Sequence, residues 1–152
     1  MSQTFRLNNS GLINRDKKLS FKFNGKTYYG FEGDTLASAL IANGVHLVGR
    51  SFKYHRPRGI MSAGSEEPNA IVQVGNDERI TEPNVRATEI EIHEGLEATS
   101  QNCWPRVNFD IGGINNLLSP FLPAGFYYKT FMWPASFWKK YEYFIRHSAG
   151  LG

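Results

Sequence analysis

The chain has 152 residues and a net charge of +3, and a chain of this length fits one domain plus an extension. A single cysteine, Cys103, excludes an intrachain disulfide and any four-thiolate zinc or iron–sulfur site. The positive charge is too weak to indicate nucleic acid by itself. The sequence contains no secretory signal and no apolar run of membrane-spanning length, so we expect a cytoplasmic protein.

The first regular element predicted is a β-hairpin. Apolar and polar residues alternate over residues 19–23 and again over residues 27–31, as in half-buried strands, and the Asn24-Gly25 pair between them is a strong turn signal. A strict two-residue turn places Phe21 opposite Tyr28, which turns the odd residues of the two strands to opposite faces. A longer loop or a bulge just after the turn keeps them on one face, and both arrangements stay open here.

A short helix is predicted directly after the hairpin. Asp34 is a suitable N-cap, because its carboxylate accepts hydrogen bonds from the free N–H groups of the first turn and suits the positive end of the helix. Three apolar residues share one face of this helix: Leu36, Leu40 and Ile41. Asn43-Gly44 ends it, since glycine readily adopts the left-handed conformation. A hairpin followed by a helix is typical of an α+β fold.

The middle of the chain combines a long loop with further strands. Residues 49–69 predict a functional loop without regular structure. Residues 70–74 are apolar and predict a strand that Gly75 closes. Ile90 and Ile92 alternate with polar residues, which predicts another strand with one wet face.

The last third of the chain changes character. Prolines and a glycine pair break long regular elements after residue 102, although residues 135–147 fit one helix. Large aromatic side chains crowd residues 121–144, more than a small sheet needs. They form either a satellite core or, as we favour, a surface that buries against another domain or subunit. Our contact candidates in this tail are Phe126, Tyr127, Tyr128, Phe131 and Trp133.

The hairpin, the segment Gly-Asp-Thr-Leu-x-x-Ala-Leu-x-x-x-Gly at residues 33–44 and the long loop together resemble the β-grasp domain of plant-type [2Fe–2S] ferredoxins. The loop sequence GRSFKYHRPRGI at residues 49–60 is similar to a narrower group. This group is the N-terminal ferredoxin-like domain of amine-oxidising flavoenzymes, which include heterotetrameric sarcosine oxidase alpha subunits, cyanide synthases and opine oxidases. The motifs SQNCWP at residues 100–105 and FLPAGFYYKTF at residues 121–131 resemble the sarcosine oxidase alpha subunits in particular.

The resemblance implies an organisation of the whole chain. Residues 1–18 form an N-terminal arm, residues 19–103 an α+β ferredoxin-like β-grasp domain, and residues 104–152 an irregular aromatic-rich extension. In the family the extension leads to a flavin- and dinucleotide-binding domain. This sequence contains no Gly-x-Gly-x-x-Gly fingerprint, so we expect it to be a fragment or a split form.

The resemblance argues against the family's cofactor, however. The family's ligand spacing, Cys-x4-Cys-x2-Cys with a fourth cysteine later, falls on Ser62, Glu67, Ala70 and Thr88. None of these residues supplies a thiolate, and one carboxylate cannot hold a cluster. We therefore expect no [2Fe–2S] cluster, no other metal and no catalytic residue in this segment.

The resemblance also implies a function for the parent complex. It is the oxidative demethylation of sarcosine to glycine, formaldehyde and hydrogen peroxide, with FAD, FMN and NAD bound largely outside this segment. The segment itself would be a structural and assembly domain. Its expected partners are the remaining domains of the alpha subunit and the beta, gamma and delta subunits, without nucleic acid or membrane.

A basic cluster in the long loop leaves a second hypothesis open. Five potential cations lie within nine residues, and aromatic side chains are interleaved among them. They suit contacts with neighbouring domains, an anionic cofactor or, least of all, nucleic acid. In the alternative function, a stand-alone β-grasp module holds an anionic partner through these residues. The candidate contacts are Arg50, Lys53, His55, Arg56 and Arg58.

Overall fold

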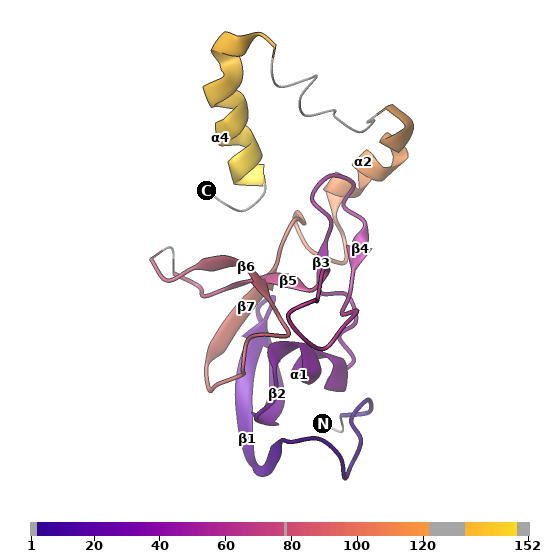
Figure 1. The fold of residues 1–152 in the computed structure, drawn as a ribbon, viewed down its shortest axis with the longest axis vertical. Helices are drawn as coiled ribbons and strands as arrows, with labels where there is room; N and C mark the ends of the chain where they lie inside the picture. The colour runs from indigo at the N-terminus through magenta and orange to yellow at the C-terminus, as the bar shows by residue number, and fades with distance from the viewer. Residues whose placement is uncertain (1–2, 78, 122–132, 149–152) are drawn as a thin grey trace.

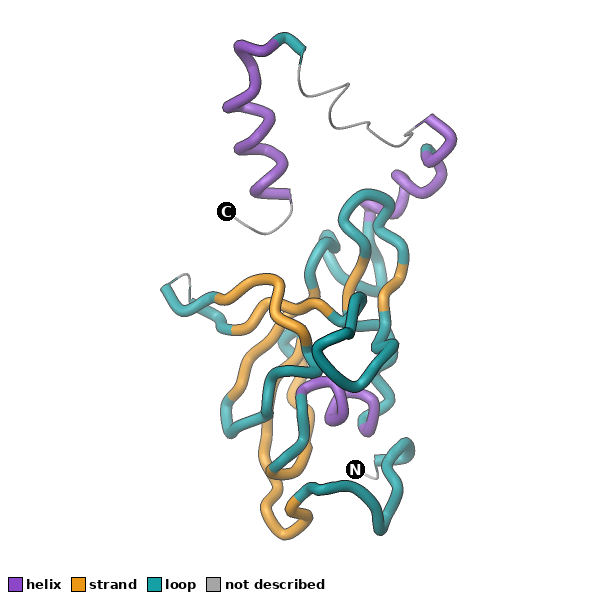
Figure 2. Tube along the Cα trace, viewed as in Figure 1, coloured by secondary structure: helices purple, strands orange, loops and turns teal. Residues whose placement is uncertain are grey.

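A mixed β-sheet with one helix against its face forms the centre of the molecule (Figures 1 and 2). The computed structural model describes residues 3–77, 79–121 and 133–148. Within these residues five strands pair in the order β2-β1-β7-β5-β6, and β1 and β7 run parallel. This arrangement confirms the predicted α+β class. The elements are β1 (Asn14–Phe23), β2 (Lys26–Glu32), α1 (Leu36–Ala42), β5 (Ile71–Val74), β6 (Glu82–Arg86) and β7 (Leu96–Ser100).

The hairpin has the strict two-residue turn. Asn24 and Gly25 both have positive φ, at 51° and 75°, as a tight hairpin turn requires. Phe21 therefore lies opposite Tyr28, and their rings stack with centroids 5.9 Å apart. The odd residues of β1 and the even residues of β2 share the core face, which settles the choice left open by the sequence. Strand β1 also begins earlier than predicted, at Asn14, with a register shift before Lys18.

The core lies between the sheet and α1. Gly30 on β2 sits where these layers come closest, because a Cβ at this position would lie 2.4 Å from Ile92 Cδ1 and 3.2 Å from Ala39 Cβ. Only a residue without a side chain leaves that space to the helix and to Ile92. The largest fully buried apolar side chains are Phe21, Phe23, Leu36, Leu40, Val48 and Val72.

The prediction of a strand around Ile90 and Ile92 is wrong. This segment forms only an isolated bridge, because its backbone groups bond to the start of α1: the Leu36 N–H donates to Ile90 O at 2.7 Å, and the Ile92 N–H donates to Asp34 O at 3.0 Å. Ile92 is nevertheless buried. The strands on either side of this segment, β6 and β7, are short and were not predicted from sequence.

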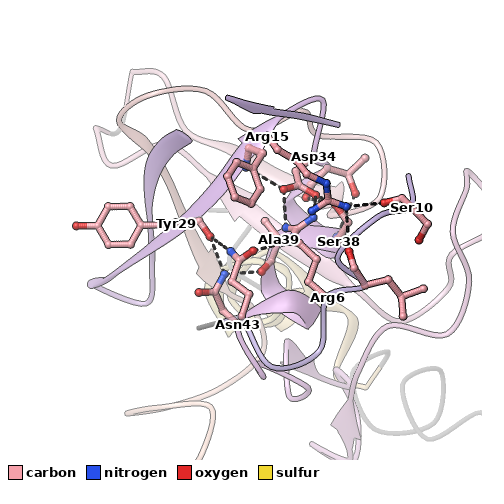
Figure 3. Close-up of polar contacts among 12 residues, drawn as sticks. Arg6, Ser10, Arg15, Tyr29, Asp34, Ser38, Ala39 and Asn43 are labelled. Atoms are coloured by element: carbon pink, nitrogen blue, oxygen red, sulfur yellow. Dashed lines mark hydrogen bonds and ion pairs between the residues drawn. The ribbon is translucent and has the colours of Figure 1, made fainter. Parts of the chain in front are cut away.

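The predicted N-cap is wrong by one residue. Thr35 caps α1, with its Oγ1 accepting from the Ser38 N–H, whereas Asp34 is buried beneath the N-terminal arm. The Asp34 carboxylate accepts two bonds from the Arg6 guanidinium, at 3.0 and 2.6 Å, and further bonds from the Phe31 N–H and the Ser38 hydroxyl (Figure 3). Asp34 therefore attaches the N-terminal arm to the sheet and does not cap the helix.

Further contacts hold the arm against α1 and β2. The Arg15 guanidinium donates to the Leu7 and Ser10 carbonyls, which closes the arm into a loop (Figure 3). Phe5 packs edge-on against His46, with ring centroids 5.0 Å apart. Residues 3–12 thus belong to the folded unit, although they contain no helix or strand.

The remaining elements lie outside the main sheet. Two short strands, β3 (Gly49–Arg50) and β4 (Pro57–Arg58), pair as a separate ribbon. No helix in the described part of the chain is long and apolar enough to cross a membrane. The helix expected over residues 135–147 is present as the 3-10 turn η3 followed by α4. The extension contains η1 (Ile111–Gly113), α2 (Ile114–Leu117), η2 (Ser119–Phe121), η3 (Ala135–Phe137) and α4 (Trp138–Ser148).

We expect Arg6→Ala to lower the free energy of unfolding by about 3 kcal/mol, because it leaves the buried Asp34 carboxylate without its charged partner. The matched control is Lys17→Ala, which breaks the exposed pair with Glu32 and should cost far less stability, because solvent screens an exposed pair. Urea denaturation of both variants measures the difference. Equal losses would show that the arm does not stabilise the sheet through Asp34.

Candidate functional site: a loop closed on a buried carboxylate

The long loop before β5 folds around one side chain. The Glu67 carboxylate is buried, and its two oxygens point to opposite sides of the loop. Oε2 accepts from the N–H groups of Met61, at 2.7 Å, and Ser62, at 2.6 Å. Oε1 accepts from the N–H groups of Asn69, at 2.7 Å, and Ala70, at 3.0 Å. Four backbone donors that no strand or helix satisfies thus converge on one anion.

These hydrogen bonds keep Glu67 ionised in spite of its burial. Burial by itself raises the pKa of the Glu67 carboxyl, because a low-dielectric site disfavours the charge. The backbone N–H donors of Ser62, Asn69, Met61 and Ala70 outweigh this effect and lower the pKa from its ordinary value of 4.5 to about 2. Glu67 is therefore a fixed internal negative charge at neutral pH.

The structure brings the four sequence-predicted ligand positions together. The N–H groups of Ser62 and Ala70 both bond to the Glu67 carboxylate, and the Ser62 hydroxyl lies 3.4 Å from it. The Thr88 hydroxyl donates to the Gly64 carbonyl in the same loop at 2.8 Å. The spacing taken from sequence therefore corresponds to one place in the fold.

The side chains at that place do not match an iron–sulfur donor set. A [2Fe–2S] cluster takes thiolates, or in one class two imidazoles, whereas these positions carry two hydroxyls, one carboxylate and one methyl group. The single cysteine, Cys103, follows β7 and contacts the Ser100 carbonyl. Burial and then the nearby Asp110 charge raise the pKa of its thiol. In the described residues no cluster of three His, Cys, Asp or Glu could hold a metal ion.

The basic loop is tied to the extension by a second buried carboxylate, that of Asp110. Asp110 Oδ2 lies 2.7 Å from His55 Nδ1 and 3.6 Å from Arg50 Nε, and Oδ1 accepts from the Trp104 and Gly112 N–H groups. Arg50 also donates to the Val107 carbonyl at 2.8 Å and to the His55 carbonyl at 2.9 Å. The cations predicted to contact a partner therefore have acceptors within the chain.

The other basic residues of the loop also contact their own chain. Arg56 Nε donates to Asn116 Oδ1 at 3.0 Å, and the Arg56 guanidinium lies over the Tyr54 ring. Arg58 donates to Asn69 Oδ1 at 2.8 Å. Lys53 Nζ lies 4.9 Å from the Tyr54 ring centroid. The role of the five cations in binding a partner stays a prediction.

Comparison with known proteins identifies the family. Residues 16–103 match the family described as "2Fe-2S iron-sulfur cluster binding domain", and this range is more than half of the chain. The chain belongs to this family. The match covers the sheet, α1 and the Glu67 loop. The 2Fe-2S domain of this chain thus has the family's fold but lacks the family's thiolates at the expected positions.

Individual relatives point to one enzyme. The chain is 65% identical to the sarcosine oxidase subunit alpha of Rhizobium meliloti (strain 1021), over 98% of this chain and 15% of that protein. It is 46% identical to the same subunit of Corynebacterium sp. (strain U-96), over 57% of this chain and 9% of that protein. The chain thus spans only a small part of the length of these relatives.

One solved structure is also similar. It is described as the crystal structure of L-proline dehydrogenase from P. horikoshii, with 26% sequence identity and a TM-score of 0.46. The similarity covers 58% of this chain and 16% of that one.

The apolar surface predicted for the tail is only partly described. Phe126, Tyr127, Tyr128 and Phe131 lie outside the described residues. Trp133 is 80% exposed. Sequence reasoning placed the aromatics after residue 120, whereas exposed apolar side chains begin earlier in the extension, at Trp104, Phe109, Ile111, Ile114, Leu117 and Leu118.

Two structural roles were missed from sequence. Asp110 has no periodic pattern around it, and only its place before Gly112-Gly113, typical of an Asp that caps a turn, offers a signal. Glu67 was identified by spacing, but its role as an acceptor was not. Its four donors lie up to six residues away, and nothing in their side chains reveals that their N–H groups converge.

Glu67→Gln should lower the free energy of unfolding at pH 7 by about 3 kcal/mol, because the amide group would direct a donor at two backbone donors. The folded pKa lies below the unfolded one, so the charge stabilises the wild type fully above about pH 4.5. That stability is lost as the pH falls towards 2. The difference between the two proteins should therefore shrink with acidification.

Denaturation curves between pH 7 and pH 2.5 measure this difference. The carboxyls of Glu32, Glu94 and Glu97 also have lowered pKa values, owing first to hydrogen bonds from Lys17, Ser20 and Lys22. They titrate alike in both proteins and cancel in the comparison. A difference that is independent of pH would contradict an ionised Glu67.

Gly112→Ala should weaken the attachment of the extension, because its Cβ would lie 2.2 Å from His55 Cε1 and 2.3 Å from His55 Nδ1. We expect a loss of about 1–3 kcal/mol and faster proteolytic cleavage after residue 103. Gly113→Ala is the matched control, since its Cβ would meet nothing within 4 Å. Limited proteolysis of the two variants side by side tests this, and equal cleavage rates would contradict the His55–Asp110 attachment.

Proposed function

We propose that this chain is the ferredoxin-like β-grasp part of the alpha subunit of a sarcosine oxidase-like flavoenzyme, and that it serves assembly rather than catalysis. The observation that carries the proposal is the 65% identity to such a subunit over 98% of this chain. This similarity includes the extension, whereas the family match ends at residue 103. The extension is therefore shared with the Rhizobium meliloti subunit.

In this proposal the complete enzyme performs the chemistry elsewhere. It oxidises sarcosine with molecular oxygen and water to glycine, formaldehyde and hydrogen peroxide, with FAD, FMN and NAD held by other parts of the complex. The partners of this chain are the rest of the alpha subunit and the beta, gamma and delta subunits, in the cytoplasm. In the proposed organisation the N-terminal arm, expected to reach residue 18, ends where β1 begins at Asn14, and the extension follows residue 103.

Exposed apolar side chains on the extension support an assembly role. Leu117 on α2 is 78% exposed, and Trp133 is 80% exposed. Large apolar side chains that stay exposed in this number are typical of a surface against which another protein packs. The basic loop is attached to the start of the extension, because Arg50 and His55 hold the Asp110 carboxylate. These contacts favour assembly over the alternative of a stand-alone module that binds an anion.

The test uses the full-length alpha subunit co-expressed with its partner subunits. We expect the double variant Leu117→Ser, Trp133→Ser to weaken assembly at least roughly tenfold, because burying such side chains contributes about 1.5–3 kcal/mol each. Native mass spectrometry measures the assembled fraction, and oxygen consumption with sarcosine measures activity.

The matched control for this test is Ile80→Ser. Ile80 is 68% exposed, but it lies at the turn between β5 and β6 and not on the extension (Figure 1). Its assembly and its activity with sarcosine should equal those of the wild type. The proposed role is wrong if the double variant assembles as well as the Ile80 control.

A further inference from the structure

The loop around Glu67 has the features of an anion-binding site, although its anion is part of the chain. Backbone N–H groups from both ends of the loop, at residues 61–62 and 69–70, point at one carboxylate. Concave sets of backbone N–H groups of this kind bind phosphates and iron–sulfur clusters in many proteins. A loop whose donors point inward requires an acceptor at its centre, since unpaired buried N–H groups are costly, and an anion is the strongest acceptor for several donors at once.

The position of that centre coincides with the cluster spacing. Glu67 occupies the second position of the x4-x2 pattern, and the amides of the first and third positions, Ser62 and Ala70, bond to its carboxylate. The fourth position, Thr88, closes the loop from the other side through Gly64. The carboxylate of the second position therefore binds the amides of the first and third positions, and the fourth position is bonded to the same loop.

We propose that the Glu67 carboxylate replaces the [2Fe–2S] cluster as the anion around which residues 59–70 fold. The cluster and the carboxylate share what the loop recognises, a compact negative charge that accepts backbone hydrogen bonds. They differ in redox chemistry, which the carboxylate lacks. The domain thus keeps the loop of a cluster-binding protein and has exchanged the cofactor for a side chain of its own.

Two further contacts explain how a single residue can do this. Arg86 Nε on β6 donates to the Glu67 carbonyl at 3.2 Å, and the Ala87 N–H donates to the Ala70 carbonyl at 2.9 Å. Both contacts fix the backbone of the loop against the edge of the sheet. The Glu67 carboxylate then binds the four backbone N–H groups of the loop, and no metal ion is needed to hold the loop together. The replacement does not depend on the assembly role, because it concerns the interior of one loop and not a partner surface.

The decisive experiment restores thiolates in steps. The quadruple variant Ser62→Cys, Glu67→Cys, Ala70→Cys, Thr88→Cys supplies four thiolates and removes the carboxylate. The triple variant Ser62→Cys, Ala70→Cys, Thr88→Cys supplies three thiolates and keeps it. Each purified chain is incubated with ferrous iron and sulfide without oxygen and is then desalted. Iron, acid-labile sulfide and the visible absorbance of the oxidised protein are measured.

The expected results distinguish a loop that holds the Glu67 carboxylate from a loop that is free to bind a cluster. The quadruple variant should bind about two iron and two sulfide per chain, as one [2Fe–2S] cluster requires. The wild type and the triple variant should bind neither in stoichiometric amount, because Glu67 occupies the centre of the loop. A cluster in the wild type or the triple variant would overturn the proposal, as would a folded quadruple variant that binds no iron.

A second measurement tests the same proposal when the quadruple variant does not fold. In the wild type, the amides of Met61, Ser62, Asn69 and Ala70 should be protected from hydrogen exchange. In Glu67→Gln we expect them to exchange roughly tenfold faster or more, since a bond to a charged acceptor is lost. The amide of Ala39, bonded within α1, is the internal control and should not change. Unchanged exchange at all four amides would overturn the proposal.

Discussion

Four backbone N–H groups in the loop before β5 have no partner in any strand or helix, and one carboxylate satisfies them all. Without Glu67 these groups would stay buried and unpaired, and the loop would have to open to water. The loop precedes β5, whose partners β6 and β7 complete the sheet. The order of this part of the fold therefore depends on a charge in the interior, which the N–H groups keep ionised.

The same construction occurs at two other places in the described structure. Asp34 holds the N-terminal arm through Arg6, and Asp110 holds the basic loop and the extension through His55 and Arg50. In each case the buried carboxylate also accepts a backbone N–H, from Phe31 in β2 at Asp34 and from Trp104 at Asp110. Charge-assisted hydrogen bonds are stronger than neutral ones, so a single acid can order a segment that has no ladder of its own.

This construction also explains how a domain can lose a cofactor without losing its fold. A cluster connects four positions by covalent bonds to sulfur, whereas a carboxylate connects the same neighbourhood by hydrogen bonds to the backbone. Because the donors are main-chain groups, the side chains at Ser62 and Ala70 were free to change. The surface of the domain then remains available for contacts with other parts of a larger enzyme.

Local signals were sufficient for much of the fold. The Asn24-Gly25 turn, the apolar face of α1 and the glycine at its end depend on residues close in sequence, and the structure has all three. The ligand spacing taken from the resemblance falls on residues of one loop and on Thr88, whose hydroxyl bonds to that loop. Prediction was wrong around Ile90, where alternation indicated a strand although the backbone bonds to α1 instead.

The α+β class and the shortage of thiolates follow from periodicity and composition, and the resemblance to ferredoxin-like domains implied the place of the cluster-type loop. The role of each buried acid became visible only in the folded chain. Asp34 was expected to cap α1 but pairs with Arg6, and Glu67 was one residue among four but accepts from four backbone amides. Backbone N–H groups are alike in every residue, so their convergence on one carboxylate exists only after the chain has folded.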